Sequence, residues 1–172
     1  MNAHEIFQKL DHAFAVQIMT YFREESREIY KTTVATLATQ RKLRPVFIQK
    51  KPVAVQIDWL IKTLKQKSAD TVSEHLLQVW LLREKKEMLI MFVDDLGIEH
   101  DEDGGVDELP ETIDAEKLKV AIDHLLENYP APVVTLYLRV FQIQQAEGWP
   151  EIAEALEKDE RLQLGASIEA AA

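Results

Sequence analysis

Residues 70–82 of the chain read DTVSEHLLQVWLL, and this stretch decides the fold class. Asp70 is a suitable N-cap residue for a helix, and the apolar side chains that follow cover more than half of a helical circumference. These side chains are Val72, Leu76, Leu77, Val79, Trp80 and Leu81. A helix that is apolar on so many sides is normally buried between other elements. We therefore expect an all-α fold with this helix at its centre.

Amphipathic stretches on both sides of residues 70–82 supply the helices that would cover it. In each of them apolar positions recur at steps of three and four residues, which is the period of one buried helical stripe. The stretches are residues 6–22, 29–37, 53–64, 88–96, 114–126, 131–145 and 150–156. Five Gly and six Pro are too few for a loop-rich β protein. The sequence thus predicts a helical bundle of about six to eight helices with negligible strand content.

Prolines and charged residues divide the predicted helices into segments. Residues 44–52 carry Pro45 and Pro52 near their ends, which favours an extended connector. The predicted segments are an N-terminal helical arm at 1–43, a Pro-bounded basic linker at 44–52, a main helical body at 53–164 and a disordered tail at 165–172. The arm is either two helices or one long helix. The long form would exceed the length that a compact domain needs, and so would favour a partner helix.

An internal repeat is one interpretation of the apolar pattern. The similar pairs are residues 57–61 and 122–126, 79–83 and 136–140, and 91–96 and 151–156. Two three-helix units of this kind would form a pseudo-symmetric bundle and bury each other's apolar faces. The alternative interpretation is that any two amphipathic helices resemble each other at this level of detail.

Charge is segregated along the chain. Residues 29–69 hold nine Lys or Arg against the single acid Asp58, whereas residues 94–128 hold thirteen Asp or Glu against two Lys. Such segregation indicates association more than a reaction, because the summed field acts over about 8 Å at physiological salt. The net charge of −10 argues against a dedicated nucleic-acid binder, although the local basic stretch keeps that alternative open.

Several classes of protein are disfavoured by what the sequence lacks. The chain has no Cys, which removes disulfides and thiol nucleophiles and makes a cytoplasmic location the expected one. The longest apolar run, residues 88–93, is much shorter than the roughly 20 residues of a membrane-spanning helix. No Gly-rich phosphate loop, Gly-x-Ser-x-Gly motif or His-Glu-x-x-His motif occurs. We therefore expect a protein that is not an enzyme, binds no cofactor and does not enter membranes.

An acidic loop at residues 99–111 follows most of a calcium-loop pattern. Its candidate metal ligands are Glu99, Asp101, Asp103 and Asp107. They occupy the first, third, fifth and ninth positions of such a loop, with a glycine at the sixth. Pro110, however, stands at the twelfth position, where the bidentate glutamate belongs. The loop is therefore either a divalent-cation site of calcium-like type or a solvated acidic loop.

The second candidate surface is basic. Its residues are Arg41, Lys42, Arg44, Lys50 and Lys51. They could dock an acidic protein surface, or hold the phosphates of a nucleic acid if the protein is a nucleic-acid accessory protein. The closest acidic surface is residues 94–111 of the same protein, within the chain or across a symmetric dimer. We therefore expect a non-catalytic protein-protein interaction or adaptor module, a homodimer through its N-terminal arm, with a partner whose identity the sequence does not give.

Overall fold

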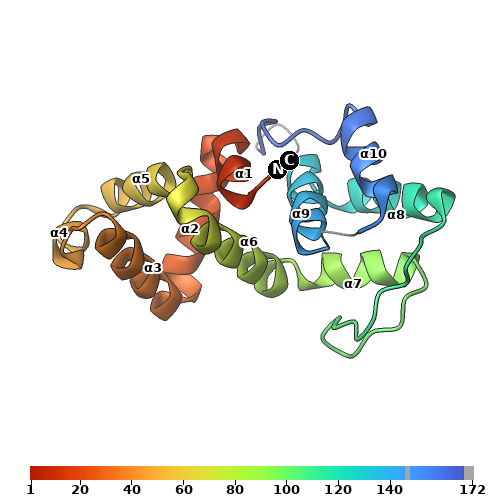
Figure 1. The fold of residues 1–172 in the computed structure, drawn as a ribbon, viewed down its shortest axis with the longest axis horizontal. Helices are drawn as coiled ribbons and strands as arrows, with labels where there is room; N and C mark the ends of the chain where they lie inside the picture. Colours follow the sequence, from red (N-terminus) through yellow and green to blue (C-terminus); the bar gives the residue numbers. More distant parts are fainter. Residues whose placement is uncertain (146–147, 169–172) are drawn as a thin grey trace. The chain divides into compact units, whose positions relative to one another are not determined.

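The computed structural model describes residues 1–145 and 148–168, and every regular element in these ranges is a helix (Figure 1). The elements are α1 (Ala3–Lys9), α2 (His12–Glu25), α3 (Arg27–Gln40), α4 (Pro45–Gln49), α5 (Val53–Leu64), η1 (Lys67–Ala69), α6 (Asp70–Glu84), α7 (Lys86–Asp95), α8 (Ala115–Asn128), α9 (Ala131–Gln144) and α10 (Pro150–Lys158). The all-α prediction is confirmed. The described helices outnumber the six to eight expected, because the predicted stretch 6–22 divides between α1 and α2, and α4 lies within the predicted linker at 44–52. None of the described helices is both long enough and apolar enough to cross a membrane.

Local breaks divide the N-terminal region, and each has a physical cause. Asp11 precedes α2, and its carboxylate accepts a hydrogen bond from the Phe14 N–H at 3.4 Å. Ser26 adopts φ −141° and ψ 58°, which ends α2 and begins α3 in a new direction. Residues 1–43 therefore contain three helices, and the long-helix alternative does not apply.

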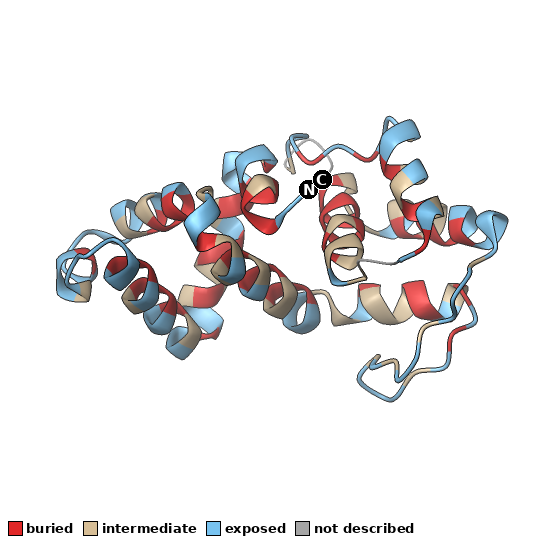
Figure 2. Ribbon diagram, viewed as in Figure 1, coloured by how far each residue is buried: buried red, intermediate tan, exposed pale blue. Residues whose placement is uncertain are grey.

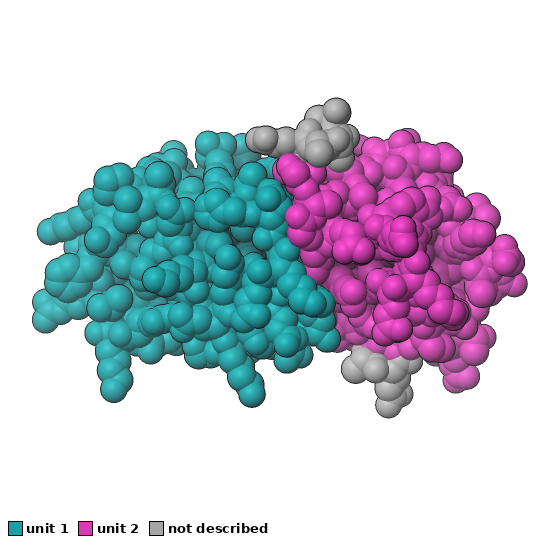
Figure 3. All heavy atoms as spheres, turned by 90° about the horizontal axis from the view of Figure 1, so that it is seen from above, with its two compact units in different colours: residues 1–80 teal, residues 81–172 magenta. Residues whose placement is uncertain are grey.

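Contacts divide the chain into two compact units, residues 1–80 and residues 81–172, which Figure 3 colours separately. This division differs from the predicted arm, linker and body. Residues 1–43 do not stand apart, because α1, α2 and α3 all pack against α5. The predicted linker at 44–52 contains α4. The predicted tail at 165–172 lies partly outside the described residues.

The core of the first unit is built from aromatic and aliphatic side chains of helices that lie far apart in the sequence. Phe7, Phe14 and Phe22 are fully buried, as the apolar stripe in residues 6–22 predicted. Phe14 packs edge-on against Trp80, with ring centroids 5.6 Å apart. Leu60 of α5 is also fully buried. Figure 2 shows these buried faces turned towards one another. The contact between Phe14 and Trp80 joins α2 to α6 within this unit.

The second unit has its own aromatic cluster. The rings of Phe92 and Tyr137 lie 5.2 Å apart, and Phe141 lies 5.4 Å from Trp149. The Trp149 indole N–H donates a hydrogen bond to the Pro110 carbonyl at 2.8 Å, so it fastens the end of the acidic loop. Full burial raises the pKa of the Tyr137 hydroxyl.

Helix α8 of the second unit begins directly after Asp114, the first residue of the amphipathic stretch 114–126. The Asp114 carboxylate accepts hydrogen bonds from the backbone N–H groups of Glu116 at 2.9 Å and Lys117 at 3.0 Å. These bonds satisfy two of the N–H groups that a helix start leaves without partners. Asp114 is therefore the N-cap of α8. Asp70, the predicted N-cap of α6, is instead the first residue of that helix, with helical φ −55° and ψ −48°, and its carboxylate bonds to His4.

The proposed repeat matches the order of helices but not the compact units. Helices α5, α6 and α7 would form the first three-helix unit, and α8, α9 and α10 the second. The division between residues 80 and 81 falls inside α6, so the first three helices do not form one compact body. The repeat stays an interpretation.

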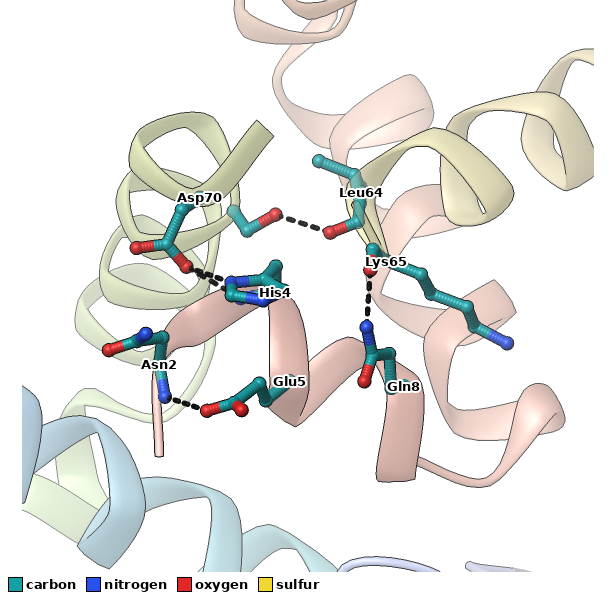
Figure 4. Close-up of polar contacts among 8 residues, drawn as sticks. Asn2, His4, Glu5, Gln8, Leu64, Lys65 and Asp70 are labelled. Atoms are coloured by element: carbon teal, nitrogen blue, oxygen red, sulfur yellow. Dashed lines mark hydrogen bonds and ion pairs between the residues drawn. The ribbon is translucent and has the colours of Figure 1, made fainter. Parts of the chain in front are cut away.

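A polar cluster fastens α1 to the start of α6 (Figure 4). The Asp70 carboxylate accepts a hydrogen bond from the His4 backbone N–H at 2.9 Å and lies 2.7 Å from Nδ1 of the same residue. The Gln8 side-chain amide donates to the Lys65 carbonyl at 2.7 Å. Burial works to raise the pKa of Asp70, but the hydrogen bonds from His4 outweigh it and hold that pKa below its ordinary value.

We expect the substitution Asp70→Ala to lower the free energy of unfolding by about 1–2 kcal/mol, because the His4 N–H loses its acceptor. The value lies at the low end for a charged hydrogen bond, since the Asp70 side chain is 35% exposed and solvent screens it. Urea unfolding at pH 7 measures the loss, and Thr71→Ala, an exposed neighbour, is the control. Because the Asp70 pKa is lowered on folding, its stabilisation is present above pH 4 or so and fades as the pH falls through the folded-state pKa. A difference that stays constant down to about pH 2 would contradict this role.

Candidate functional site

The turns on either side of α4 carry a surface that is both basic and apolar, which we call the α4 patch. Its cations are Arg41, Lys42, Arg44, Lys50 and Lys51, and its apolar side chains are Leu43, Val46, Phe47, Val53 and Val55. All ten are exposed, and Figure 2 shows α4 and its flanking turns largely in the colour of exposed residues. Five of the eight large apolar side chains that the described residues expose belong to this patch. Exposed apolar side chains grouped in this way mark interaction surfaces more often than scattered ones do.

The local sequence explains the exposure. Pro45 occupies the first turn of α4, where its missing N–H costs nothing. The helix has five residues, and Ile48 is the one that it buries. Pro52 then precedes α5 and prevents α4 from continuing into it. A helix held by a single buried side chain presents its other side chains to solvent.

Lys42 holds an unusual backbone conformation at the end of α3. Its φ is 56°, and no other non-glycine residue in the described ranges has a positive φ. The Leu43 N–H donates to the Ala38 carbonyl at 2.8 Å, which closes the helix in a Schellman motif. Helix α7 ends in the same motif with Gly97, φ 70°, in the corresponding position. A lysine therefore stands where glycine is favoured, at a cost of about 1 kcal/mol.

The cations of the α4 patch have no ionic partners within the part of the chain that is described. The ion pairs found there all involve other basic groups. Asp58, the one acid in residues 29–69, lies 3.5 Å from His12 instead. The positive charge of the patch is therefore not neutralised internally and remains available to a partner.

The acidic loop uses its carboxylates to hold its own turn. The Asp101 carboxylate accepts hydrogen bonds from the backbone N–H groups of Asp103 at 2.8 Å and Gly105 at 2.7 Å. Asp103 forms an ion pair with Lys86 of α7. Within the described ranges no three His, Asp or Glu side chains form a group that could hold a metal ion. Asp101 and Asp103 are thus brought into one turn, but Glu99, Asp101, Asp103 and Asp107 are not assembled as a ligand set. A calcium-binding role for the loop stays a prediction.

Histidines pair with aspartates that are not their sequence neighbours. The ion pairs are His4 with Asp70, His12 with Asp58, His100 with Asp94 and His124 with Asp95. In the acidic loop, His100 Nε2 lies 2.6 Å from the Asp94 carboxylate and Nδ1 lies 2.6 Å from the Asp101 carbonyl. The Asp101 carbonyl and then Asp94 raise the pKa of His100, because both favour the doubly protonated ring. No spacing in the sequence indicates these pairs, since the fold creates them.

A cavity of about 500 Å³ beside α4 was not found from the sequence. Its lining residues are Arg23, Arg27, Tyr30, Lys31, Gln49 and Gln56. Arg27 and Lys31 lie four residues apart on one side of α3, and the break at Ser26 places Arg23, in the last turn of α2, at the same cavity. The sequence places Glu24, Glu25 and Glu28 between these cations. The net charge of residues 23–31 is therefore near zero and does not indicate a basic site.

We expect Lys42→Gly to raise the free energy of unfolding by up to about 1 kcal/mol, because glycine adopts a positive φ without the steric cost of a Cβ. Urea unfolding measures the gain. The control is Ala35→Gly in the middle of α3, which should lower the stability by about 0.5–1 kcal/mol. A loss of stability in Lys42→Gly would show that the lysine side chain itself holds the turn.

We expect the pKa of His100 to lie above the ordinary histidine value of about 6.5 and to fall in the variant Asp94→Asn. NMR titration of the His100 ring protons measures both values. Because the folded-state pKa is raised, the contribution of His100 to stability is full below about pH 6.5 and is lost as the pH rises through the folded-state pKa. Glu102→Gln removes a nearby charge that does not contact the ring and serves as the control. An ordinary pKa for His100 in the unmodified protein would disprove the two contacts.

Comparison with known proteins identifies no relative of this chain. No protein-family model matches the chain, and no curated protein or solved structure matches it either. The function of this chain is therefore inferred from its own surfaces.

Proposed function

We propose that this chain is a non-catalytic protein-interaction or adaptor module that binds an acidic segment of a partner protein on the α4 patch. One observation carries the proposal: residues 41–55 expose five cations without ionic partners in the described chain together with five apolar side chains, among them Phe47, which is 60% exposed. A partner segment with both carboxylates and apolar side chains complements both properties of the patch.

Phe47 is the expected anchor of the interaction. Aromatic and arginine side chains dominate the binding energy of protein interfaces, and they act best when neighbouring contacts exclude water. Leu43 and Val46 flank Phe47 along the chain, and Arg44 lies on the same short segment. The patch therefore offers both apolar and charged contacts, as protein interfaces do.

Nucleic acid is the second candidate partner, and the patch fits it less well. Proteins that hold single strands stack successive bases on several aromatic rings, whereas Phe47 is the only aromatic residue of the α4 patch. Val46, Val53 and Val55 offer nothing to a phosphate backbone. The net charge of −10 also opposes the approach of a polyanion.

A second copy of the chain is one source of the acidic segment. Residues 94–111 carry nine acids and no Lys or Arg, and so complement the α4 patch in charge. A homodimer formed in this way would use each patch once. Dimerisation through residues 1–43 has less support, since Phe7, Phe14 and Phe22 are buried within their own unit. The cytoplasmic location likewise stays a prediction from the sequence.

A photo-crosslinking amino acid placed at position 47 tests the proposal in the cell that makes the protein. Position 120 is the matched control, because Phe47 and Val120 are 60% and 62% exposed. We expect position 47 to crosslink to acidic segments of a protein, identified by mass spectrometry of the joined peptides, and position 120 not to do so. Lys42→Gly should reduce the yield from position 47, because it removes a cation without destabilising the fold.

Three results would contradict the proposal. Crosslinks from position 47 to RNA or DNA would favour the nucleic-acid alternative. Equal yields from positions 47 and 120 would show that the patch has no special role. Absence of any crosslink from position 47 would mean that the patch has no partner in that cell. Crosslinks to residues 94–111 of a second copy would support the homodimer as the form of the interaction.

A further inference from the structure

The cavity beside α4 is lined by three basic residues and by no acidic residue. Arg23 lies in the last turn of α2, Arg27 is the first residue of α3, and Lys31 lies one turn further along α3. All three side chains line the cavity of about 500 Å³, and no Asp or Glu does. Glu28, the acid between Arg27 and Lys31, lines a different cavity beside Thr32 and Thr36. The site therefore has three positive charges and no internal counter-charge on its walls.

No ionic partner compensates these three cations elsewhere in the described ranges. The ion pairs of the chain do not include Arg23, Arg27 or Lys31. Arg27 is also the first residue of α3, where the positive end of the helix dipole disfavours a cation. The arrangement is unfavourable for the empty protein and favourable once an anion is bound.

The three uncharged lining residues, Tyr30, Gln49 and Gln56, are joined by hydrogen bonds. The Tyr30 hydroxyl donates to the Gln56 side-chain carbonyl at 2.9 Å. The Gln56 side-chain NH₂ donates to the backbone carbonyls of Gln49 at 3.1 Å and Lys51 at 2.8 Å. These bonds fix α3, the end of α4 and α5 around the cavity, so its shape exists before a ligand enters. Such preorganisation lowers the cost of binding.

We infer that this cavity binds a phosphate monoester group, held by the side chains of Arg23, Arg27 and Lys31. A phosphate monoester carries a charge of about −1.5 to −2 at pH 7 and three acceptor oxygens. Two guanidinium groups and one ammonium group match that charge better than they match a single carboxylate. The phosphate could belong to a small molecule or to a phosphorylated side chain. The inference does not rest on the proposed role of the α4 patch, because its residues are different.

NMR titration of the full chain tests the inference directly. The probes are inorganic phosphate, blocked O-phosphoserine and acetate, each at the same ionic strength and at pH 7.5. We expect the phosphate probes to give saturable shifts of the Arg23 and Arg27 side-chain N–H signals and of the Tyr30 amide signal. Acetate should give weaker shifts that do not saturate. Tighter binding of phosphoserine than of inorganic phosphate would assign the site to phosphorylated side chains, and the reverse order would assign it to free phosphate compounds.

Variants distinguish binding of phosphate in the cavity from nonspecific electrostatic attraction of phosphate to the protein. Arg27→Ala and Lys31→Ala should each raise the dissociation constant for phosphate about tenfold, because each removes a charge-assisted hydrogen bond at an exposed position. Lys62→Ala removes an exposed cation of α5 that does not line the cavity, and should leave the constant unchanged. Equal weakening by all three variants, or equal shifts with acetate and phosphate, would overturn the inference. The amide spectra of the variants show in the same experiment that they are folded.

Discussion

A helix of five residues cannot bury more than a small part of its surface, and this constraint shapes the whole end of the first unit. Helix α4 contributes one side chain, Ile48, to the core, so its remaining side chains and those of the adjoining turns face solvent. The sequence fills these exposed positions with apolar and basic residues, where polar ones would be the more soluble choice. The candidate surface and one wall of the cavity both follow from the shortness of this helix.

The acidic and the basic segments of the sequence differ in how the fold pairs their charges. In the acidic loop the carboxylates find partners nearby, as Asp101 does with backbone N–H groups and Asp103 with Lys86. Around α4 the cations find no carboxylates in the described chain. A protein gains little stability from surface ion pairs, so the absence of partners costs little. It does, however, leave a positive field directed at solvent, which is the property that steers an acidic partner.

The sequence predicts best where one element's own residues decide the outcome. The density of apolar side chains from Val72 to Leu81 predicted α6, and Asp114 predicted the start of α8. The division into two compact units was not predictable, because it depends on contacts between distant segments. Nothing near residue 14 indicates that Phe14 packs against Trp80. Two prolines around residues 46–51 favoured an extended linker, yet proline also suits the first turn of a helix, and the fold uses it there. The cavity was missed because acids alternate with Arg23, Arg27 and Lys31 in the sequence and separate from them only in space.

The hydrogen bonds of Gln56 have a consequence for how this chain can vary. Both polar atoms of its side-chain amide form hydrogen bonds: the oxygen accepts one from the Tyr30 hydroxyl, and the nitrogen donates to two backbone carbonyls. Glutamate would keep the shape but lose both donors, and leucine would remove all three hydrogen bonds, to Tyr30 and to the two backbone carbonyls. Positions 30 and 56 are therefore expected to change together in descendants of this gene, with tyrosine kept wherever the amide is kept. A chain that lost the pair would have to secure the end of α4 by other means.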